Sequence, residues 1–274
     1  MKMFLSSLVL YLFLIPVWAN TCLMVIPFPP GGSSDLYGRI IQKYNSDIVI
    51  NFKPGAYASH AISTMRNNKD AFMISVPNMY SEGNPDKNPN VELVKVLFVI
   101  DAMIVTTKNI KFSNLVTDKL NIGVNTLGST QHLISLQIKK KNPKLEVVPF
   151  GGDTKALSAL ISGDIDAYIV SSPIGNQWLK QHKTMSLLAE IPSDRPFKYD
   201  DLRLTSLNLF GVFVSKDATT EQKQHVVNCI QKSISQPGYV EEFSRIGIKP
   251  KDFNGKEKDN ILNRYVTSLR QVGL

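Results

Sequence analysis

Short apolar runs alternate with amphipathic stretches along the chain, and a turn follows most of the apolar runs. In the first part of the chain, the runs expected to form strands are 23–27, 48–52, 71–76 and 94–100. The stretches there with apolar residues at helical spacing are 34–44 and 58–66. Strands that alternate with helices in this way indicate an α/β fold with mostly parallel sheets.

The same order of strand, turn and helix returns in a second series. Its expected strands are 120–124, 145–149 and 167–170, and its expected helices are 130–140 and 154–162. A later strand is expected at 211–215, with helices near 221–235, 239–246 and 259–272. A polar segment, 81–90, is expected to be an exposed loop. The two series predict two α/β lobes with a ligand cleft between them, because ligands of open α/β sheets bind beyond the carboxyl ends of the strands.

Residues 1–19 have the pattern of a secretory signal peptide. Lys2 supplies a positive start, 5–16 form an apolar core, and Val17-Trp18-Ala19 resembles a cleavage site. A membrane anchor or a buried first strand is the alternative, but the apolar run is shorter than the roughly 20 residues that span a bilayer. A lipid anchor on Cys22 is a further, weaker alternative. We expect residues 1–19 to be removed and the rest of the chain to be exported.

The two cysteines, Cys22 and Cys229, lie far apart in the sequence. In an oxidising compartment they can form one bridge between the first strand and a late helix. A buried pair of free thiols is the equal alternative. Neither cysteine has the spacing to other cysteines and histidines that a zinc site requires, so no metal is expected.

Composition and motifs argue against nucleic-acid binding and against catalysis. The net charge of +8 is spread over the chain, and no nucleic-acid reader motif accompanies it. The chain has four histidines, no metal-spaced cluster and no Gly-x-Ser-x-Gly elbow. The acidic pair Asp164 and Asp166 is better explained by a turn before a strand. We therefore expect a binding protein rather than an enzyme.

The junction at 25–35 reads VIPFPPGGSSD, a buried strand that breaks into a Pro/Gly turn and then starts a helix. Ser33, Ser34 or Asp35 can cap that helix, whose first N–H groups face outward and favour an anion. The junction lacks the lysine and the spacing of a nucleotide-binding loop, so a small anion is the better candidate ligand. A plain strand-to-helix connection that binds nothing is the alternative.

Three later strand ends repeat this arrangement. They are 125–132, which reads NTLGSTQH, 150–154, which reads FGGDT, and 171–173, which reads SSP. Ser129 or Thr130 can cap the helix of the first, and His132 lies one turn into it. Several loops of this kind at one edge would supply the multiple hydrogen-bond donors that a carboxylate accepts.

The chain resembles a known family in a series of short blocks that follow one another in the family's order. The blocks are VIPFPPGGSSD at 25–35 with Arg39 a turn later, KPGA at 53–56, GSTQH at 128–132, VPFGG at 148–152, LISGDID at 160–166, FGVFV at 210–214 and GIKP at 247–250. Together they span nearly all of the chain after residue 19. They are similar to the substrate-binding receptors of tripartite tricarboxylate transporters, the TctC-like or Bug proteins.

The resemblance implies a periplasmic, monomeric receptor with a fold of the periplasmic-binding-protein type II kind. Two α/β lobes, 20–104 plus 215–274 and 105–214, would close on a small organic anion, and the chain would cross between them near 102–106 and 210–214. The anion is commonly a di- or tricarboxylate, an acidic amino acid or an aromatic acid. Membrane transporter subunits or a sensor are the implied partners, and no cofactor is implied.

Ligand contacts carry over from the resemblance to three loops and two further positions. They are Phe28, Pro29, Gly31, Gly32, Ser33, Ser34 and Asp35 in the first loop, Ser129, Thr130 and His132 in the second, Gly152, Asp153 and Thr154 in the third, and Asp166 and Ser171 beyond them.

The chain departs from the family pattern in two places. Residues 108–120 leave little room for the helix that normally precedes the next strand. Phe150 and Gly151 stand where the family typically has a tyrosine and a lysine or arginine, which removes a hydroxyl and a positive charge near the ligand. A repurposed receptor that acts in signalling or protein interaction is therefore the alternative function. A hydrolase or transferase that uses Asp166 and His132 is the third.

Overall fold

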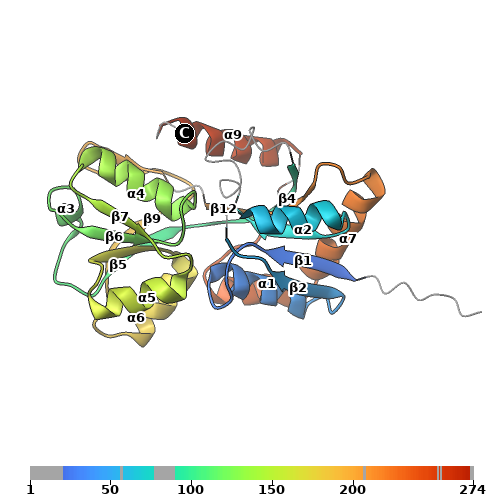
Figure 1. Ribbon diagram of the computed structural model, residues 1–274, viewed down its shortest axis with the longest axis horizontal. Coiled ribbons are helices and arrows are strands. Elements are labelled where there is room, and N and C mark those ends of the chain that lie inside the picture. Colours follow the sequence, from blue (N-terminus) through green and yellow to red (C-terminus); the bar gives the residue numbers. More distant parts are fainter. Residues whose placement is uncertain are drawn as a thin grey trace, which may run out of the picture.

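The computed structural model describes residues 21–55, 58–76, 90–205, 208–251, 253 and 255–271. The expected signal peptide and nearly all of the expected loop at 81–90 lie outside these residues. The described chain forms two α/β lobes, each built around a five-stranded sheet (Figure 1). None of its helices combines the length and the apolar character needed to cross a bilayer.

The first lobe contains the sheet with strand order β2-β1-β3-β12-β4. Its strands are β1 (Cys22–Ile26), β2 (Ile48–Phe52), β3 (Phe72–Ser75), β4 (Val91–Ile100) and β12 (Asn208–Ser215). Strand β1 runs parallel to β2 and β3, and β12 runs antiparallel to β3 and β4. The helices of this lobe are α1 (Ser33–Lys43), α2 (Ser59–Asn67), α7 (Thr220–Ile234) and α8 (Pro237–Arg245).

The second lobe contains the sheet with strand order β7-β6-β8-β5-β9. Its strands are β5 (Ala102–Thr106), β6 (Asn121–Val124), β7 (Glu146–Pro149), β8 (Ala167–Ser171) and β9 (Ser186–Ile191). Its helices are α3 (Phe112–Leu115), α4 (Thr130–Lys141), α5 (Asp153–Ser162) and α6 (Ser172–Gln181), and a hairpin follows from β10 (Phe197–Tyr199) and β11 (Leu202–Leu204). Only the short α3 occupies 108–120, as the limited room there predicted.

The last helix, α9 (Gly255–Gln271), lies along the top of the view in Figure 1, above both lobes. Phe253 and Ile261 pack in one apolar cluster with Leu209 of the first lobe and Leu133 of the second. Arg264 donates hydrogen bonds to the carbonyl oxygens of two residues that follow β9. The C-terminal segment therefore contacts both lobes.

An aromatic cluster forms the centre of the first lobe. The Tyr37 ring lies edge-on to Phe98 and Phe210, with centroid distances of 5.3 and 5.2 Å. Phe98 and Phe210 stack at 5.3 Å, and Phe243 of α8 packs against Phe98 at 5.0 Å. Because Tyr37 belongs to α1, this cluster fixes the helix that begins at the predicted anion-binding loop.

The two crossings between the lobes differ from the expected ones. β4 ends at Ile100 in the first sheet and β5 begins at Ala102 in the second, so the first crossing is at Asp101. The chain is back in the first sheet by Asn208, because β12 pairs with β3 and β4. The expected boundaries at 105 and 214, and crossings at 102–106 and 210–214, are wrong. One polar residue inside a long apolar run gives little warning that the chain changes sheets.

The carboxylate of Asp101 also holds the crossing in place. Its Oδ1 accepts hydrogen bonds from the backbone N–H and the hydroxyl of Ser193, both at 2.7 Å. The backbone carbonyl oxygen of Asp101 accepts a hydrogen bond from the N–H of Ser172 at 2.9 Å. A short, well-bonded connection of this kind is suited to a hinge between two lobes.

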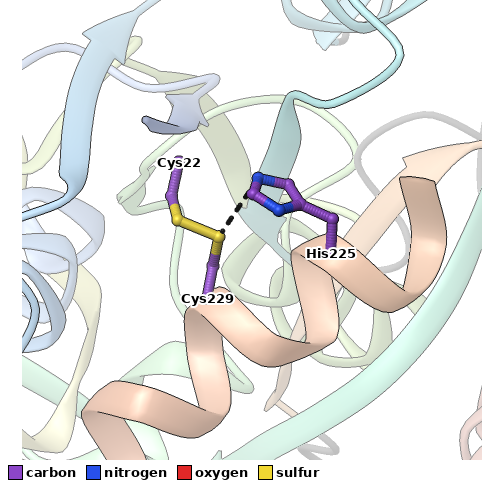
Figure 2. Close-up of side chains that lie close together, drawn as sticks. All are labelled: Cys22, His225 and Cys229. Atoms are coloured by element: carbon purple, nitrogen blue, oxygen red, sulfur yellow. Dashed lines mark hydrogen bonds between the residues drawn. A yellow bond between two sulfur atoms is a disulfide. The ribbon is translucent and has the colours of Figure 1, made fainter. Parts of the chain in front are cut away.

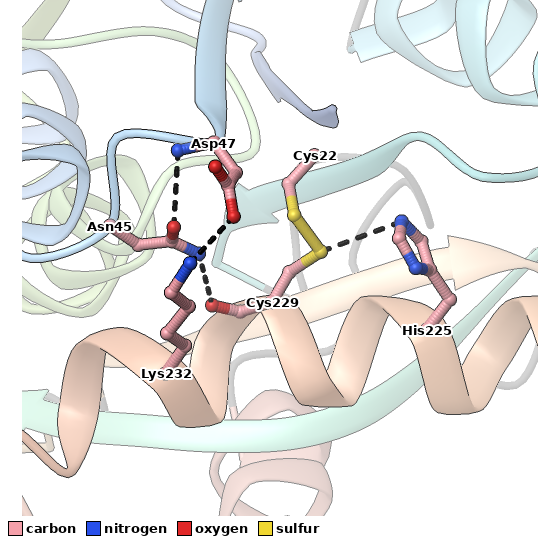
Figure 3. The surroundings of a disulfide bond; sticks show 6 residues. All are labelled: Cys22, Asn45, Asp47, His225, Cys229 and Lys232. Carbon is pink, nitrogen blue, oxygen red and sulfur yellow. Dashed lines mark hydrogen bonds and ion pairs between the residues drawn. A yellow bond between two sulfur atoms is a disulfide. The ribbon is translucent and has the colours of Figure 1, made fainter. Parts of the chain in front are cut away.

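A disulfide joins Cys22 at the start of β1 to Cys229 in α7, with 6.1 Å between the two Cα atoms (Figure 2). Of the two alternatives left by the sequence, the structure therefore has the bridge. Further bonds join the same elements (Figure 3). Asn45 Nδ2 donates to the carbonyl oxygen of Cys229 at 3.0 Å, and Lys232 pairs with Asp47 at 2.7 Å. The first strand, the turn after α1 and α7 are thus connected as one unit.

His225 stands beside this disulfide, with Nε2 3.5 Å from the sulfur of Cys229. The three side chains are close enough to hold a metal ion if the thiols were free. Metal binding requires thiolates, however, and each sulfur is bonded to the other. In the oxidised form the group is a structural crosslink.

Replacing both cysteines by serine is expected to lower the free energy of unfolding by about 2–5 kcal/mol, because the bridge closes a long loop in the unfolded chain. Urea unfolding followed by circular dichroism, without reductant, measures the difference. Reduced wild-type protein should match the Cys22→Ser/Cys229→Ser variant. Equal unfolding midpoints for oxidised wild type and variant would show that the bridge does not stabilise the fold.

Candidate functional site

Loops that follow β1, β6, β7 and β8 meet where the two lobes face each other. Parallel strands of one sheet end at the same edge, so the fold brings these loops together. The hydroxyl of Ser33, from the first lobe, lies 2.8 Å from the hydroxyl of Ser171, from the second. Thr130 Oγ1 similarly lies 3.3 Å from Oδ1 of Asn208, which belongs to β12. The sequence prediction that separate strand-end loops converge agrees with this geometry.

The carboxylate of Asp153 lies at the centre of the convergence. Its Oδ2 accepts hydrogen bonds from the backbone N–H of Ser33 at 3.1 Å and from the Ser33 hydroxyl at 3.0 Å. Its Oδ1 accepts from Asn125 Nδ2 at 3.0 Å and from the Tyr168 hydroxyl at 2.7 Å. Asp153 is only 2% exposed. Four donors from both lobes are therefore directed at this one buried carboxylate.

Ser33 and Asp153 each stand at the start of a helix, and the N-terminus of α1 supplies one of the donors. Ser33 is the first residue of α1 and Asp153 is the first residue of α5. The first N–H groups of a helix have no partner within it, and the helix dipole favours negative charge there. In the closed arrangement the Asp153 carboxylate itself accepts the donors at the start of α1, and its expected contact with a bound anion stays a prediction.

Buried tyrosines complete the hydrogen bonding. Burial raises the pKa of Tyr168 well above its ordinary value, and the negative charge of Asp153 raises it further. Burial likewise raises the pKa of Tyr37, whose hydroxyl donates to Ser171 Oγ at 3.3 Å. Both phenols therefore stay protonated and act as hydrogen-bond donors. Protonated phenols suit a site for negative charge.

The cavity that remains between the lobes is about 30 Å³. Its described lining comes from both lobes: Phe28, Ser33, Ser34, Tyr37, Val76, Ile100, Asn125, Ser129, Gln131, Ser171, Asn208 and Phe210. A space of this size holds a water molecule but no dicarboxylate. The structure is thus a closed form, with no room between the lobes for a molecule of that size.

Glycines allow this close approach of the lobes. A Cβ at Gly32 would come within 3.1 Å of Asp153 Oδ2, and a Cβ at Gly152 within 2.9 Å of Pro29. Gly31 has a φ of +89°, which few other residues adopt, and its N–H donates to Asp35 Oδ2 at 2.8 Å. A Cβ at Gly31 would also come within 3.2 Å of Thr154 Oγ1.

Two predicted residues of the second loop support α4. Ser129 caps the helix, and its hydroxyl accepts from the N–H of His132 at 3.2 Å. His132 Nδ1 in turn accepts from the N–H of Gly128 at 3.2 Å. Burial lowers the pKa of His132, which favours the neutral ring that can accept this bond. Ser129 lines the cavity, whereas the described lining does not include His132.

Two predicted acidic residues bond to neighbours of their own and are absent from the described lining of the interlobe cavity. Asp35 accepts from Gly31 and pairs with Arg39 at 2.6 Å, so it braces its own loop. Asp166 precedes β8, where it pairs with Lys108 and accepts from the N–H of Asn121 at 2.6 Å. This is the amino end of the parallel strands, the edge opposite the convergent loops. Asp166 and His132 therefore cannot form the catalytic pair of the third hypothesis.

Three of the hydrogen-bond donors at the site, Tyr37, Asn125 and Tyr168, were missing from the predicted set, and so were the lining residues Val76, Ile100, Gln131, Asn208 and Phe210. Asn125 directly follows β6, and this position was a usable signal. Tyr37 lies one helical turn after Ser33, the first residue of α1; Gly32 is the N-cap there, without a side-chain cap bond, so the expected cap by Ser33, Ser34 or Asp35 is wrong. Tyr168 carries no signal in the sequence, because an aromatic residue in a buried strand is ordinarily part of the core.

A larger cavity, about 850 Å³, lies between α9 and the segment 192–196. Its described lining includes Val99, Arg195 and Arg264. None of the predicted ligand residues lines it. The strand-end loops and this cavity are therefore separate features of the molecule.

Comparison with known proteins supports a binding-protein fold. The chain is 23% identical over 263 residues to the UPF0065 protein in the tcbD-tcbE intergenic region of Pseudomonas sp. (strain P51). The aligned part covers 82% of this chain and 77% of that protein. UPF0065 denotes the Bug family. No family model matches the chain.

Three solved structures share the whole architecture. Rpa4515 of R. palustris with adipate has a TM-score of 0.72 at 18% identity and covers 92% of this chain and 95% of its own. MatC of Rhodopseudomonas palustris with bound malate has a TM-score of 0.72 at 16% identity and covers 91% and 98%. The periplasmic binding protein BugD has a TM-score of 0.70 at 14% identity and covers 92% and 97%. The expected resemblance is confirmed: the fold of this chain is that of the Bug and TctC-type periplasmic binding proteins.

Proposed function

We propose that this chain is a periplasmic solute-binding receptor that closes its two lobes on a small carboxylate. The observation that carries the proposal is the set of donors around Asp153, which is built from both lobes to hold one carboxylate. Two proteins of the same fold have the dicarboxylates adipate and malate bound in their structures. A solute carboxylate would take the N–H and hydroxyl of Ser33 that Asp153 Oδ2 occupies in the closed form.

Binding begins when the lobes open at their connections, which include Asp101. Asp153 belongs to the second lobe, so opening withdraws its carboxylate from Ser33. The N–H and hydroxyl of Ser33 then become available to a solute. Closing brings Ser171 of the second lobe back beside Ser33 and removes the bound group from water, which strengthens each hydrogen bond.

The lining determines which class of solute fits. The described lining of the interlobe cavity contains no lysine or arginine, so charge is balanced by hydroxyls, amides and helix N-termini. Such contacts recognise a carboxylate group rather than one particular acid. We therefore assign the class as small carboxylates, including di- and tricarboxylates, acidic amino acids and aromatic acids, with a tripartite tricarboxylate-type transporter as the receiving partner.

A receptor-like protein that signals or binds another protein, without transport, is the second candidate. The specific observation in its favour is that the closed cleft already contains an internal carboxylate and only about 30 Å³ of free space. In that case the closed form would be the working form, and solutes would have no effect on it.

A thermal-unfolding screen of the protein without residues 1–19 separates the two candidates. Sodium malate, adipate, citrate, glutamate and benzoate are added at equal pH, with sodium chloride at matched ionic strength as the control. An acid at a hundred times its dissociation constant stabilises by about 2.7 kcal/mol, which raises the melting temperature by roughly 5–10 °C. No shift with any acid would contradict the receptor and favour the second candidate.

Gly32→Val is expected to abolish binding of an acid found in that screen without unfolding the protein. The backbone of Gly32 is extended, with φ −100° and ψ −172°, which valine adopts readily. Its side chain, however, would occupy the space beside Ser33 where the carboxylate lies. Calorimetric titration should show at least a roughly hundredfold loss of affinity, with an unchanged circular dichroism spectrum. Retained affinity would disprove the role of the first loop.

Ser158→Ala is the matched control for these binding measurements. Ser158 is an exposed residue of the same α5 that begins with Asp153. Its hydroxyl bonds to the carbonyl oxygen of Thr154, one turn earlier in its own helix, at 3.3 Å. The variant should bind the acid as the wild type does, and a loss there would show that the assay reports general damage to α5.

A further inference from the structure

We propose that Asp153 is an internal ligand of this protein: its carboxylate holds the two lobes closed when no solute is bound, and it thereby weakens the binding of external carboxylates. The closure itself follows from the geometry of Asp153. The competition with solutes rests on the receptor function proposed above. The two parts are tested separately below.

The second lobe fixes the position of the Asp153 side chain. Asn125 and Tyr168 both donate to Oδ1, and both belong to the same lobe as Asp153. These two bonds leave Oδ2 directed at the first lobe. The second lobe therefore orients the carboxylate so that Oδ2 can accept hydrogen bonds from the first lobe.

The first lobe receives this carboxylate at the start of α1. Ser33 donates both its N–H and its hydroxyl to Oδ2, across 120 positions of the sequence. The nearest glycine, Gly32, has no side chain that would keep Oδ2 away. The two bonds join the lobes through the donors that a solute carboxylate would need.

An ordinary acidic residue at a helix start does not explain this arrangement. Asp and Glu are common there because they stabilise the N-terminus of their own helix. Such a side chain normally stays exposed and bonds to its own first turn. Asp153 is buried, and the four bonds described above run to Ser33, Asn125 and Tyr168 and none to α5.

Competition follows from the shared donors. Asp153 and a solute carboxylate cannot both occupy the N–H and hydroxyl of Ser33. The closed, internally bonded form is thus unable to bind a solute, and the apparent dissociation constant rises as the open fraction falls. Removing the carboxylate should make binding of external acids about tenfold to a hundredfold tighter, the range expected for hydrogen bonds to a charged group.

The test compares Asp153→Ala with wild type and with Asp164→Ala. Asp164 is an exposed acid just beyond the other end of α5, so its variant makes the same change in charge without touching the cleft. Small-angle X-ray scattering of the ligand-free proteins measures the radius of gyration. We expect wild type and Asp164→Ala to be compact and Asp153→Ala to be larger, because its lobes separate.

Sodium acetate then serves as a replacement carboxylate. It should return Asp153→Ala to the compact radius, whereas sodium chloride at the same ionic strength should not. If circular dichroism shows that Asp153→Ala is unfolded, Asp153→Asn replaces it, since the amide keeps the size and one acceptor but loses the charge. Asp153→Asn should have an intermediate radius.

The outcomes separate this inference from the receptor function. A variant as compact as wild type, with no response to acetate, overturns the internal ligand even if acids bind. Opening and acetate-driven closing, with no acid of the panel binding either protein, support the internal ligand and contradict the receptor. Tighter binding of a panel acid to Asp153→Ala than to wild type and Asp164→Ala supports both, and equal affinities overturn the competition.

Discussion

The buried carboxylate of Asp153 is the interaction on which the closed structure depends. A charge removed from water must be compensated, and here the N-terminus of α1, one side-chain amide and two hydroxyls supply the compensation. The first lobe contributes the Ser33 donors and the second contributes Asn125 and Tyr168. Because the donors are divided between the lobes, the charge is fully satisfied only when the lobes are closed.

The order of strands and helices was predicted well from the sequence where a polar or Gly/Pro-containing turn separates one element from the next. β2 was expected at 48–52 and is observed as Ile48–Phe52. β5 was missed because only Asp101 separates it from β4. α6 was missed because it contains Gly175, which resembles a helix breaker. A Cβ there would meet Val170 and Met103 at 2.9 and 3.0 Å, so this glycine serves close packing.

The candidate site was predictable in part, for a physical reason. The Gly and Ser residues at strand ends indicate exposed helix N-termini, and the fold brings those ends together as expected. The role of Asp153 could not be predicted, since an acid at the first position of a helix is common. Only the tertiary structure shows that Ser33, 120 positions away, is its partner.

Amide hydrogen exchange at Ser33 in the ligand-free wild-type protein tests the central claim most directly. The N–H at the first position of a helix has no partner within the helix and ordinarily exchanges fast. The account predicts that this N–H is protected in the absence of any solute, because it donates to Asp153, and that Asp153→Ala removes the protection. Fast exchange at Ser33 in the wild-type protein would contradict it.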